Sequence, residues 1–163
     1  MKKGFTLIEL LIVIALLGAL AVGLLAAVDP FEQLKKGTDT SIRNTAAEFY
    51  NATIRYYANR TAFPGEMTDL MTGQPLSSLP TAISSLGDAG ELKSDFSSLA
   101  GTNALGRIYV TITGATDKVI VCTNPQSKSF RNSEGAKYDQ TGGINSSCPT
   151  SGSAGTGCYI CFQ

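Results

Sequence analysis

The sequence contains no histidine and no tryptophan. Histidine is the commonest general base near neutral pH and a frequent zinc ligand, so its absence argues against many hydrolytic and zinc-dependent enzymes. Charge is also scarce and balanced, with 13 basic and 13 acidic residues, so the chain as a whole has no electrostatic attraction for nucleic acid. The sequence offers no nucleophile–base pair and no cluster of metal ligands, and we therefore expect neither an enzyme nor a protein with a cofactor or metal site.

Apolar residues are concentrated at the N-terminus, where the segment from Phe5 to Val28 contains one charged residue, Glu9. As a helix, this segment is long enough to cross a hydrocarbon core of roughly 30 Å. Lys2 and Lys3 precede it, which predicts a cytoplasmic N-terminus and an exported C-terminal part. A cleaved secretory signal peptide is disfavoured because the apolar core is too long. A plain single-pass anchor leaves Glu9 unexplained, since a carboxylate within a span costs on the order of 3 kcal/mol without a partner.

The stretch "KKGFTLIELLIVIALLGALAV", from Lys2 to Val22, resembles the N-terminus of type IV pilins and of type II secretion pseudopilins. A short basic leader is followed by Gly, an aromatic residue, Thr-Leu-Ile-Glu-Leu and a continuous apolar run. In that family a membrane peptidase cuts between the Gly and the aromatic residue and then methylates the new amine. The resemblance implies a leader peptide of residues 1–4, cleavage between Gly4 and Phe5, and N-methylation of Phe5.

The resemblance also implies an assembly role for Phe5 and Glu9. In pilin filaments the glutamate that matches Glu9 is thought to meet the N-terminal amine of a neighbouring subunit. Opposite charges attract strongly in a low-dielectric environment, but their desolvation offsets much of the gain. We therefore expect this pair to fix the register between subunits more than to add net stability.

Residues 5–28, the transmembrane and assembly helix, are expected to continue into an amphipathic helix half at residues 29–62. Asp29-Pro30 predicts a kink at Pro30, because proline removes one helical hydrogen bond. Phe63-Pro64-Gly65 predicts the helix end. Apolar residues recur on one helical face at Phe31, Leu34, Ile42, Ala46, Phe49, Ile54 and Tyr57. Polar residues fall elsewhere, at Lys35, Lys36, Asp39, Arg43 and Asn51.

The remaining chain predicts a variable loop region at residues 63–106, with one or two short helical turns, and a β-sheet at residues 107–163. Residues 107–114 and 118–124 predict a hairpin, 158–163 a third strand, and either 127–132 or 136–140 a fourth. The expected fold is α+β and pilin-like, with the long N-terminal helix packed on a small antiparallel sheet.

Four cysteines lie in the exported part, which predicts two disulfides and a disulfide-closed loop within the sheet region. Cys158 and Cys161 point to opposite faces if they share a strand, so they should not pair with each other. Cys122 is then joined to Cys158 or to Cys161, with Cys148 taking the other, and we favour Cys122–Cys161. The single half-motif argues against zinc. Asp117, Glu134 and Asp139 are too scattered to predict a calcium loop.

These observations predict a structural subunit of a type IV pilus-like filament. Its precursor is expected in a prokaryotic cytoplasmic membrane, as a single-pass protein with its C-terminal part exported, and the assembled form at the cell surface. The implied partners are further copies of the chain, a prepilin peptidase, and an inner-membrane assembly platform with its ATPase; nucleic acid is expected to bind, if at all, only the filament. Adhesion, motility and DNA uptake are open as roles. A type II secretion pseudopilin and a monomeric, membrane-anchored exported binding module remain as alternatives.

Overall fold

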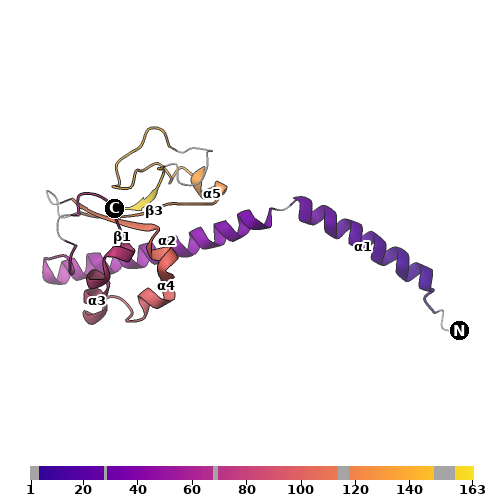
Figure 1. The fold of residues 1–163 in the computed structure, drawn as a ribbon, viewed down its shortest axis with the longest axis horizontal. Coiled ribbons are helices and arrows are strands. Elements are labelled where there is room, and N and C mark those ends of the chain that lie inside the picture. The colour runs from indigo at the N-terminus through magenta and orange to yellow at the C-terminus, as the bar shows by residue number, and fades with distance from the viewer. Residues whose placement is uncertain (1–3, 28, 68–69, 114–117, 149–156) are drawn as a thin grey trace. The chain divides into compact units, whose positions relative to one another are not determined.

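The computed structural model describes residues 4–27, 29–67, 70–113, 118–148 and 157–163. The chain divides into two compact units, Met1–Leu34 and Lys35–Gln163. The elements in chain order are α1 (Leu7–Ala27), α2 (Pro30–Arg60), β1 (Gln74–Pro75), the 3-10 helix η1 (Leu76–Ser78), α3 (Pro80–Asp88), α4 (Phe96–Leu105), β2 (Ile108–Thr113), β3 (Lys118–Thr123), α5 (Lys128–Arg131) and β4 (Ile160–Phe162) (Figure 1).

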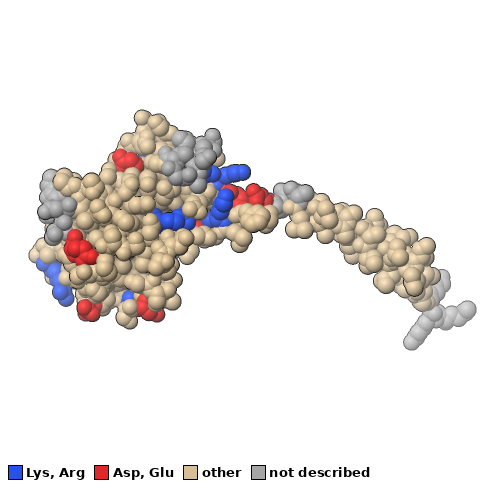
Figure 2. Space-filling model, viewed as in Figure 1, with Lys and Arg blue, Asp and Glu red and all other residues tan. Residues whose placement is uncertain are grey.

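Helix α1 is an apolar helix of 21 residues, so it is about 32 Å long. The stretch Leu7–Leu25 is long and apolar enough to cross a membrane. Its large side chains are exposed, and the face of α1 visible in Figure 2 is uncharged along its length. A helix that is apolar on all sides requires an apolar environment, which is either lipid or other apolar helices.

The interruption expected at Pro30 is present as a break between two helices. Helix α1 ends at Ala27 and α2 begins at Pro30. Proline suits the first position of a helix, where its missing N–H has no helical partner to lose. The Asp29 carboxylate caps α2, because its Oδ1 accepts hydrogen bonds from the backbone N–H groups of Phe31 (3.1 Å) and Glu32 (3.3 Å). The proline therefore starts a helix here instead of bending one.

The core of the second unit lies on α2. Ile42, Ala46, Phe49 and Ala52 are buried at helical spacing and form one cluster with the sheet, α3 and α4. The predicted apolar face holds for this central part. Three predicted members of this face are on the surface: Phe31 (73% exposed) and Leu34 (69% exposed) in the first unit, and Ile54 (43% exposed) nearer the end of α2. Helix α2 ends at Arg60, just before the predicted Phe63-Pro64-Gly65 turn.

The four strands form one antiparallel sheet in the order β1-β2-β3-β4. Strands β2 and β3 are the predicted hairpin, and β4 is the predicted terminal strand in a shorter form. Side chains of β2 and β3 alternate between two faces. One face joins the α2 core through Ile108, Val110, Ile112, Val119 and Val121. The other carries a smaller cluster of Ile120, Cys122 and Tyr159.

Both predictions for the fourth strand are wrong. Residues 127–132 contain the short helix α5, which starts because the Ser127 hydroxyl accepts a hydrogen bond from the Phe130 backbone N–H. Within residues 136–140, only Tyr138 makes isolated bridges, to Ile144 and Tyr159. The fourth strand is β1, from the region predicted as a loop, and it pairs with β2.

The region of residues 63–106 is also more regular than expected. It contains β1, η1, α3 and α4. Helix α3 begins with Pro80 and buries Ala82, Ile83 and Leu86 on one face. Helix α4 is kinked at Gly101, which adopts a positive φ of 76°. Frequent Gly, Ser and Pro residues conceal this short helical periodicity in the sequence.

Candidate functional site

The predicted assembly site is located where α1 begins. Gly4 and Phe5 precede the helix, and the Phe5 side chain is 82% exposed. The rest of the predicted leader, Met1 to Lys3, lies outside the described residues. Glu9 is in the first turn of α1, where the positive end of the helix dipole favours a carboxylate.

Thr6 and Glu9 form a capping box at this helix start. The Glu9 Oε2 atom accepts one hydrogen bond from the Thr6 backbone N–H (2.8 Å) and one from the Thr6 hydroxyl (2.6 Å). In return, the Glu9 backbone N–H donates to the Thr6 Oγ1 atom (3.3 Å). This reciprocal pattern satisfies two backbone donors that would otherwise lack partners at the helix N-terminus. The Glu9 carboxylate therefore has two hydrogen-bond donors within its own chain, both from Thr6.

Our sequence analysis did not single out Thr6. The spacing Thr-x-x-Glu, followed directly by an apolar run, is the sequence pattern of a capping box and identifies this residue. Because Glu9 was assessed only as a partner for an amine, its shorter-range partner three residues earlier was overlooked.

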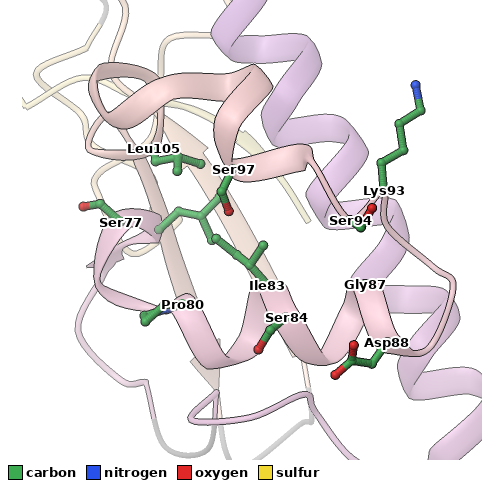
Figure 3. Close-up of a pocket in the computed structure, with 11 residues that line it drawn as sticks. Ser77, Pro80, Ile83, Ser84, Gly87, Asp88, Lys93, Ser94, Ser97 and Leu105 are labelled. Atoms are coloured by element: carbon green, nitrogen blue, oxygen red, sulfur yellow. The ribbon is translucent and has the colours of Figure 1, made fainter.

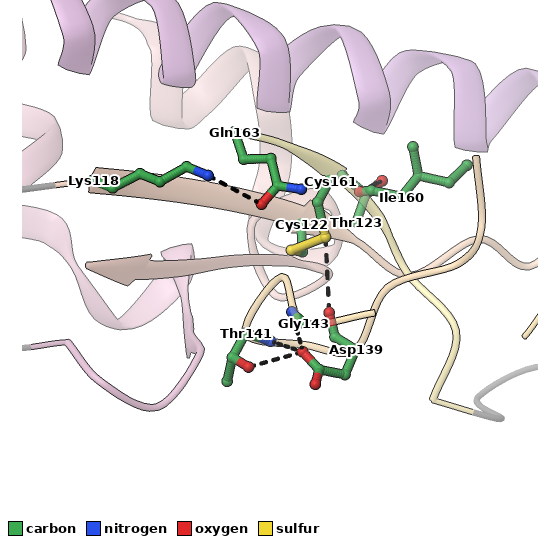
Figure 4. The surroundings of a disulfide bond; sticks show 9 residues. All are labelled: Lys118, Cys122, Thr123, Asp139, Thr141, Gly143, Ile160, Cys161 and Gln163. Atoms are coloured by element: carbon green, nitrogen blue, oxygen red, sulfur yellow. Dashed lines mark hydrogen bonds between the residues drawn. A yellow bond between two sulfur atoms is a disulfide. The ribbon is translucent and has the colours of Figure 1, made fainter. Parts of the chain in front are cut away.

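The cysteines pair as Cys122–Cys161 and Cys148–Cys158. Cys122 and Cys161 are directly opposite each other on β3 and β4, with 4.0 Å between their Cα atoms. Figure 4 shows this bridge directly above the loop that carries Asp139. The Cys161 sulfur lies 3.7 Å from the Asp139 carbonyl oxygen. The bridge therefore joins the last strand to the sheet and contacts the loop that carries Asp139.

Asp139 organises this loop through hydrogen bonds to its carboxylate. Its Oδ1 atom accepts hydrogen bonds from the Thr141 backbone N–H (2.8 Å), the Thr141 hydroxyl (2.8 Å) and the Gly143 backbone N–H (2.9 Å). Partial burial raises the pKa of Asp139, but hydrogen bonds from Thr141, Gly143 and Gly142 outweigh it, so the pKa lies below its ordinary value. Asp117 lies outside the described residues, among which no metal-binding group of three His, Cys, Asp or Glu is found.

A buried ionic cluster centred on Asp39 was missed by our sequence analysis, which placed this residue on the polar side of the helix. Asp39 is only 6% exposed. Its Oδ1 atom accepts a hydrogen bond from the Arg107 Nη2 atom (2.6 Å), and its Oδ2 atom accepts from the backbone N–H groups of Gln126 (2.9 Å) and Ser127 (2.7 Å). The same Arg107 nitrogen donates to the Asn124 carbonyl (2.7 Å). Asp39 thereby joins α2 to the start of β2 and to the segment between β3 and α5.

The second unit contains a pocket of about 390 Å³ beside α3, within the size range of small-molecule sites. Aliphatic side chains from Leu76, Ile83 and Leu105 line it together with several serines. In Figure 3, Asp88 and Lys93 are at its edge, and the Lys93 side chain extends away from Ile83 and Leu105. The pocket thus offers aliphatic surface and hydroxyl groups, with one acidic and one basic residue at its edge.

Comparison with family models gives one match. Residues 1–25 match the prokaryotic N-terminal methylation motif. Searches among curated proteins and among solved structures gave no match. The matched segment contains Gly4, Phe5, the Thr6–Glu9 capping box and most of α1. The pilin-type family that this motif marks is a structural family. Residues 1–25 thus carry the class III signal-peptide motif of type IV pilins and pseudopilins, which supports a pilin- or pseudopilin-type precursor.

Proposed function

We propose that this chain is the precursor of a structural subunit of a type IV pilus-like filament. A prepilin peptidase cleaves it between Gly4 and Phe5 and methylates the new amine of Phe5. An inner-membrane platform driven by an ATPase then moves the subunit from the membrane into a fibre, in which α1 of each copy packs against α1 of others. The C-terminal unit faces the surroundings and determines what the filament contacts.

The observation that carries this proposal is the combination of the N-terminal methylation motif with an exposed apolar helix. The large apolar side chains of α1 are exposed, and lipid or other copies of α1 would cover them equally well. Hydrophobic burial therefore changes little on transfer from membrane to fibre, and close packing and polar contacts decide assembly. Glu9 is the single charged residue in the described part of α1, so it is the natural polar contact.

The decisive measurement is the N-terminal mass of the mature protein, combined with electron microscopy of material sheared from cells. We expect a chain that begins at N-methylated Phe5 and is present in fibres. Deletion of the peptidase should leave the full precursor in the membrane and abolish the fibres. A mature protein that retains Met1 and is always monomeric would contradict the proposal.

The same experiment separates the alternatives. A type II secretion pseudopilin would show the processed N-terminus but only short periplasmic fibres, and its loss would stop protein secretion. A monomeric anchored module would keep its mass when the peptidase is deleted. In that case, the serine-lined pocket beside α3 is where a small ligand would be sought.

Replacement of Glu9 tests the mechanism of assembly. Glu9→Leu removes the charge from the span, so we expect normal membrane insertion and a strong loss of fibres. Glu9→Gln keeps the size and the capping hydrogen bond but removes the charge, and it should assemble poorly as well, because a neutral amide attracts an ammonium group weakly. The measurement is the ratio of fibre protein to membrane protein; ordinary fibre yield from both variants would remove Glu9 from the mechanism.

A further inference from the structure

The two oxygens of the Glu9 carboxylate differ in their surroundings. Both Thr6 donors, the backbone N–H and the hydroxyl, bond to Oε2 at 2.8 and 2.6 Å. Among the residues that the structure describes, no hydrogen bond to Oε1 is found. A carboxylate has acceptor sites on each oxygen, so binding through one oxygen leaves the other available.

The capping box also fixes where this open oxygen points. A glutamate side chain has several rotatable bonds, so holding it in one conformation without contacts costs conformational entropy. The two hydrogen bonds from Thr6 meet that cost within the subunit, before any partner arrives. Glu9 is therefore preorganised at the helix start, one turn from the amine that cleavage creates at Phe5.

We propose that Thr6 is the positioning residue for Glu9 in filament assembly, holding Oε2 so that Oε1 receives the Phe5 amine of a second copy of the chain. This inference rests on the proposed function. It adds Thr6, a residue that charge pairing between Glu9 and the Phe5 amine does not by itself require. The Thr6 bonds and the amine bond are made at the same time, on different oxygens. Thr6 acts through Glu9 and does not itself contact the partner amine.

This arrangement reduces the cost of carrying a carboxylate in an apolar setting. A buried ionised carboxylate is tolerated when its charge is paired and its remaining lone pairs are hydrogen-bonded. Thr6 supplies two of these bonds in the lone subunit, and the partner amine supplies the charge in the fibre. Without the Thr6 hydrogen bonds, the Glu9 carboxylate enters the fibre with fewer hydrogen bonds to its oxygens, and its side-chain conformation is not fixed.

The test compares Thr6→Val with Thr6→Ser in cells that assemble the wild-type filament. Valine has nearly the shape of threonine but no hydroxyl, whereas serine retains the donor. The matched control is Thr40→Val, which removes the exposed hydroxyl that donates to the Lys36 carbonyl (2.8 Å) on α2. We expect Thr6→Val to lower the ratio of fibre protein to processed membrane protein at least tenfold. Thr6→Ser and Thr40→Val should stay within twofold of wild type.

Two further readouts separate positioning from other effects. The N-terminal mass of each variant shows that the peptidase has processed it, and only processed subunits enter the ratio. In a Glu9→Gln background, residue 9 carries no charge to pair with the amine. There, Thr6→Val should lower the ratio of fibre protein to processed membrane protein by less than a further twofold. Full independence of the two substitutions, or full fibre yield from processed Thr6→Val, would overturn the role of Thr6 and leave the filament proposal intact.

A measurement on wild-type fibres requires no variant. Solid-state NMR of ¹³C- and ¹⁵N-labelled filaments should show dipolar coupling from the Glu9 carboxyl carbon both to the Thr6 amide nitrogen and to the methylated Phe5 amine. Coupling to only one of the two nitrogens contradicts simultaneous binding. A wild-type chain that never assembles overturns the filament proposal and this role together.

Discussion

Replacement of Asp39 by alanine is expected to destabilise the second unit by about 3–5 kcal/mol, the usual cost of breaking a buried ion pair by removing one partner. Asp39 is almost completely buried, and the Arg107 side chain that binds it is only 14% exposed. Removal of the carboxylate leaves the guanidinium group without its charge partner and two backbone N–H groups, from Gln126 and Ser127, without acceptors.

The magnitude follows from these donors. An unsatisfied buried donor costs about 1–3 kcal/mol, and a charged one costs more, although such terms do not add fully. Asp39→Asn retains one carbonyl oxygen and the shape of the side chain, so we expect about half the loss. Arg107 keeps its bond to the Asn124 carbonyl in both variants, which limits the damage.

Tyrosine fluorescence provides a suitable assay, because all six tyrosines lie in the unit Lys35–Gln163. Urea unfolding of the full-length protein in detergent gives the free energy of unfolding from the midpoint and slope. The control is Asp88→Ala, an exposed acid at the end of α3, which should change stability by less than about 0.5 kcal/mol.

A double-mutant cycle with Arg107→Ala tests the reasoning itself. The double variant should lose clearly less stability than the sum of the single variants, with a coupling of about 1–3 kcal/mol. Additive losses, or a loss below about 1 kcal/mol for Asp39→Ala, would show that this cluster does not hold the three segments together.

Two further predictions concern the sheet side of this unit. Replacing both cysteines of Cys122–Cys161 by alanine should lower the free energy of unfolding by about 4 kcal/mol, against about 3 kcal/mol for Cys148–Cys158. The difference arises because the first bridge closes the longer loop, with a sequence separation of 39 against 10. Equal losses in urea unfolding would contradict this entropic ranking. The depressed pKa of Asp139 contributes stability that is present above the unfolded-state pKa of about 4 and is lost as the pH falls through the folded-state pKa. Asp139→Asn should therefore make stability less dependent on pH below about pH 4, and an unchanged acid profile would refute the assignment.

The elements with strong local patterns were predictable from the sequence. The unbroken apolar run gave α1, the dipeptide Asp29-Pro30 gave the interruption, and the β-branched runs gave the hairpin of β2 and β3. Each of these patterns depends on neighbouring residues, so no knowledge of the tertiary structure was needed.

Other elements depended on contacts distant in sequence. Strand β1 has only two residues and is a strand because β2 offers it a free edge, which residues 74–75 alone do not reveal. Asp39 is buried because donors 68 and 87 positions away reach it. A helical pattern places an aspartate on the solvent side by default, and only the fold reveals its partners. Thr6 was a different case, because its pattern was local and was overlooked.

The ionic cluster at Asp39 also sets an order of events while the chain is being made. Residue 126 lies 87 positions after Asp39, so α2 is synthesised well before it, and we expect the carboxylate to stay hydrated until then. Burying it early, without the donors that later surround it, would cost several kcal/mol. We therefore expect α2 to dock only after residues 126 and 127 have been synthesised, and a product truncated before them should leave Asp39 in water.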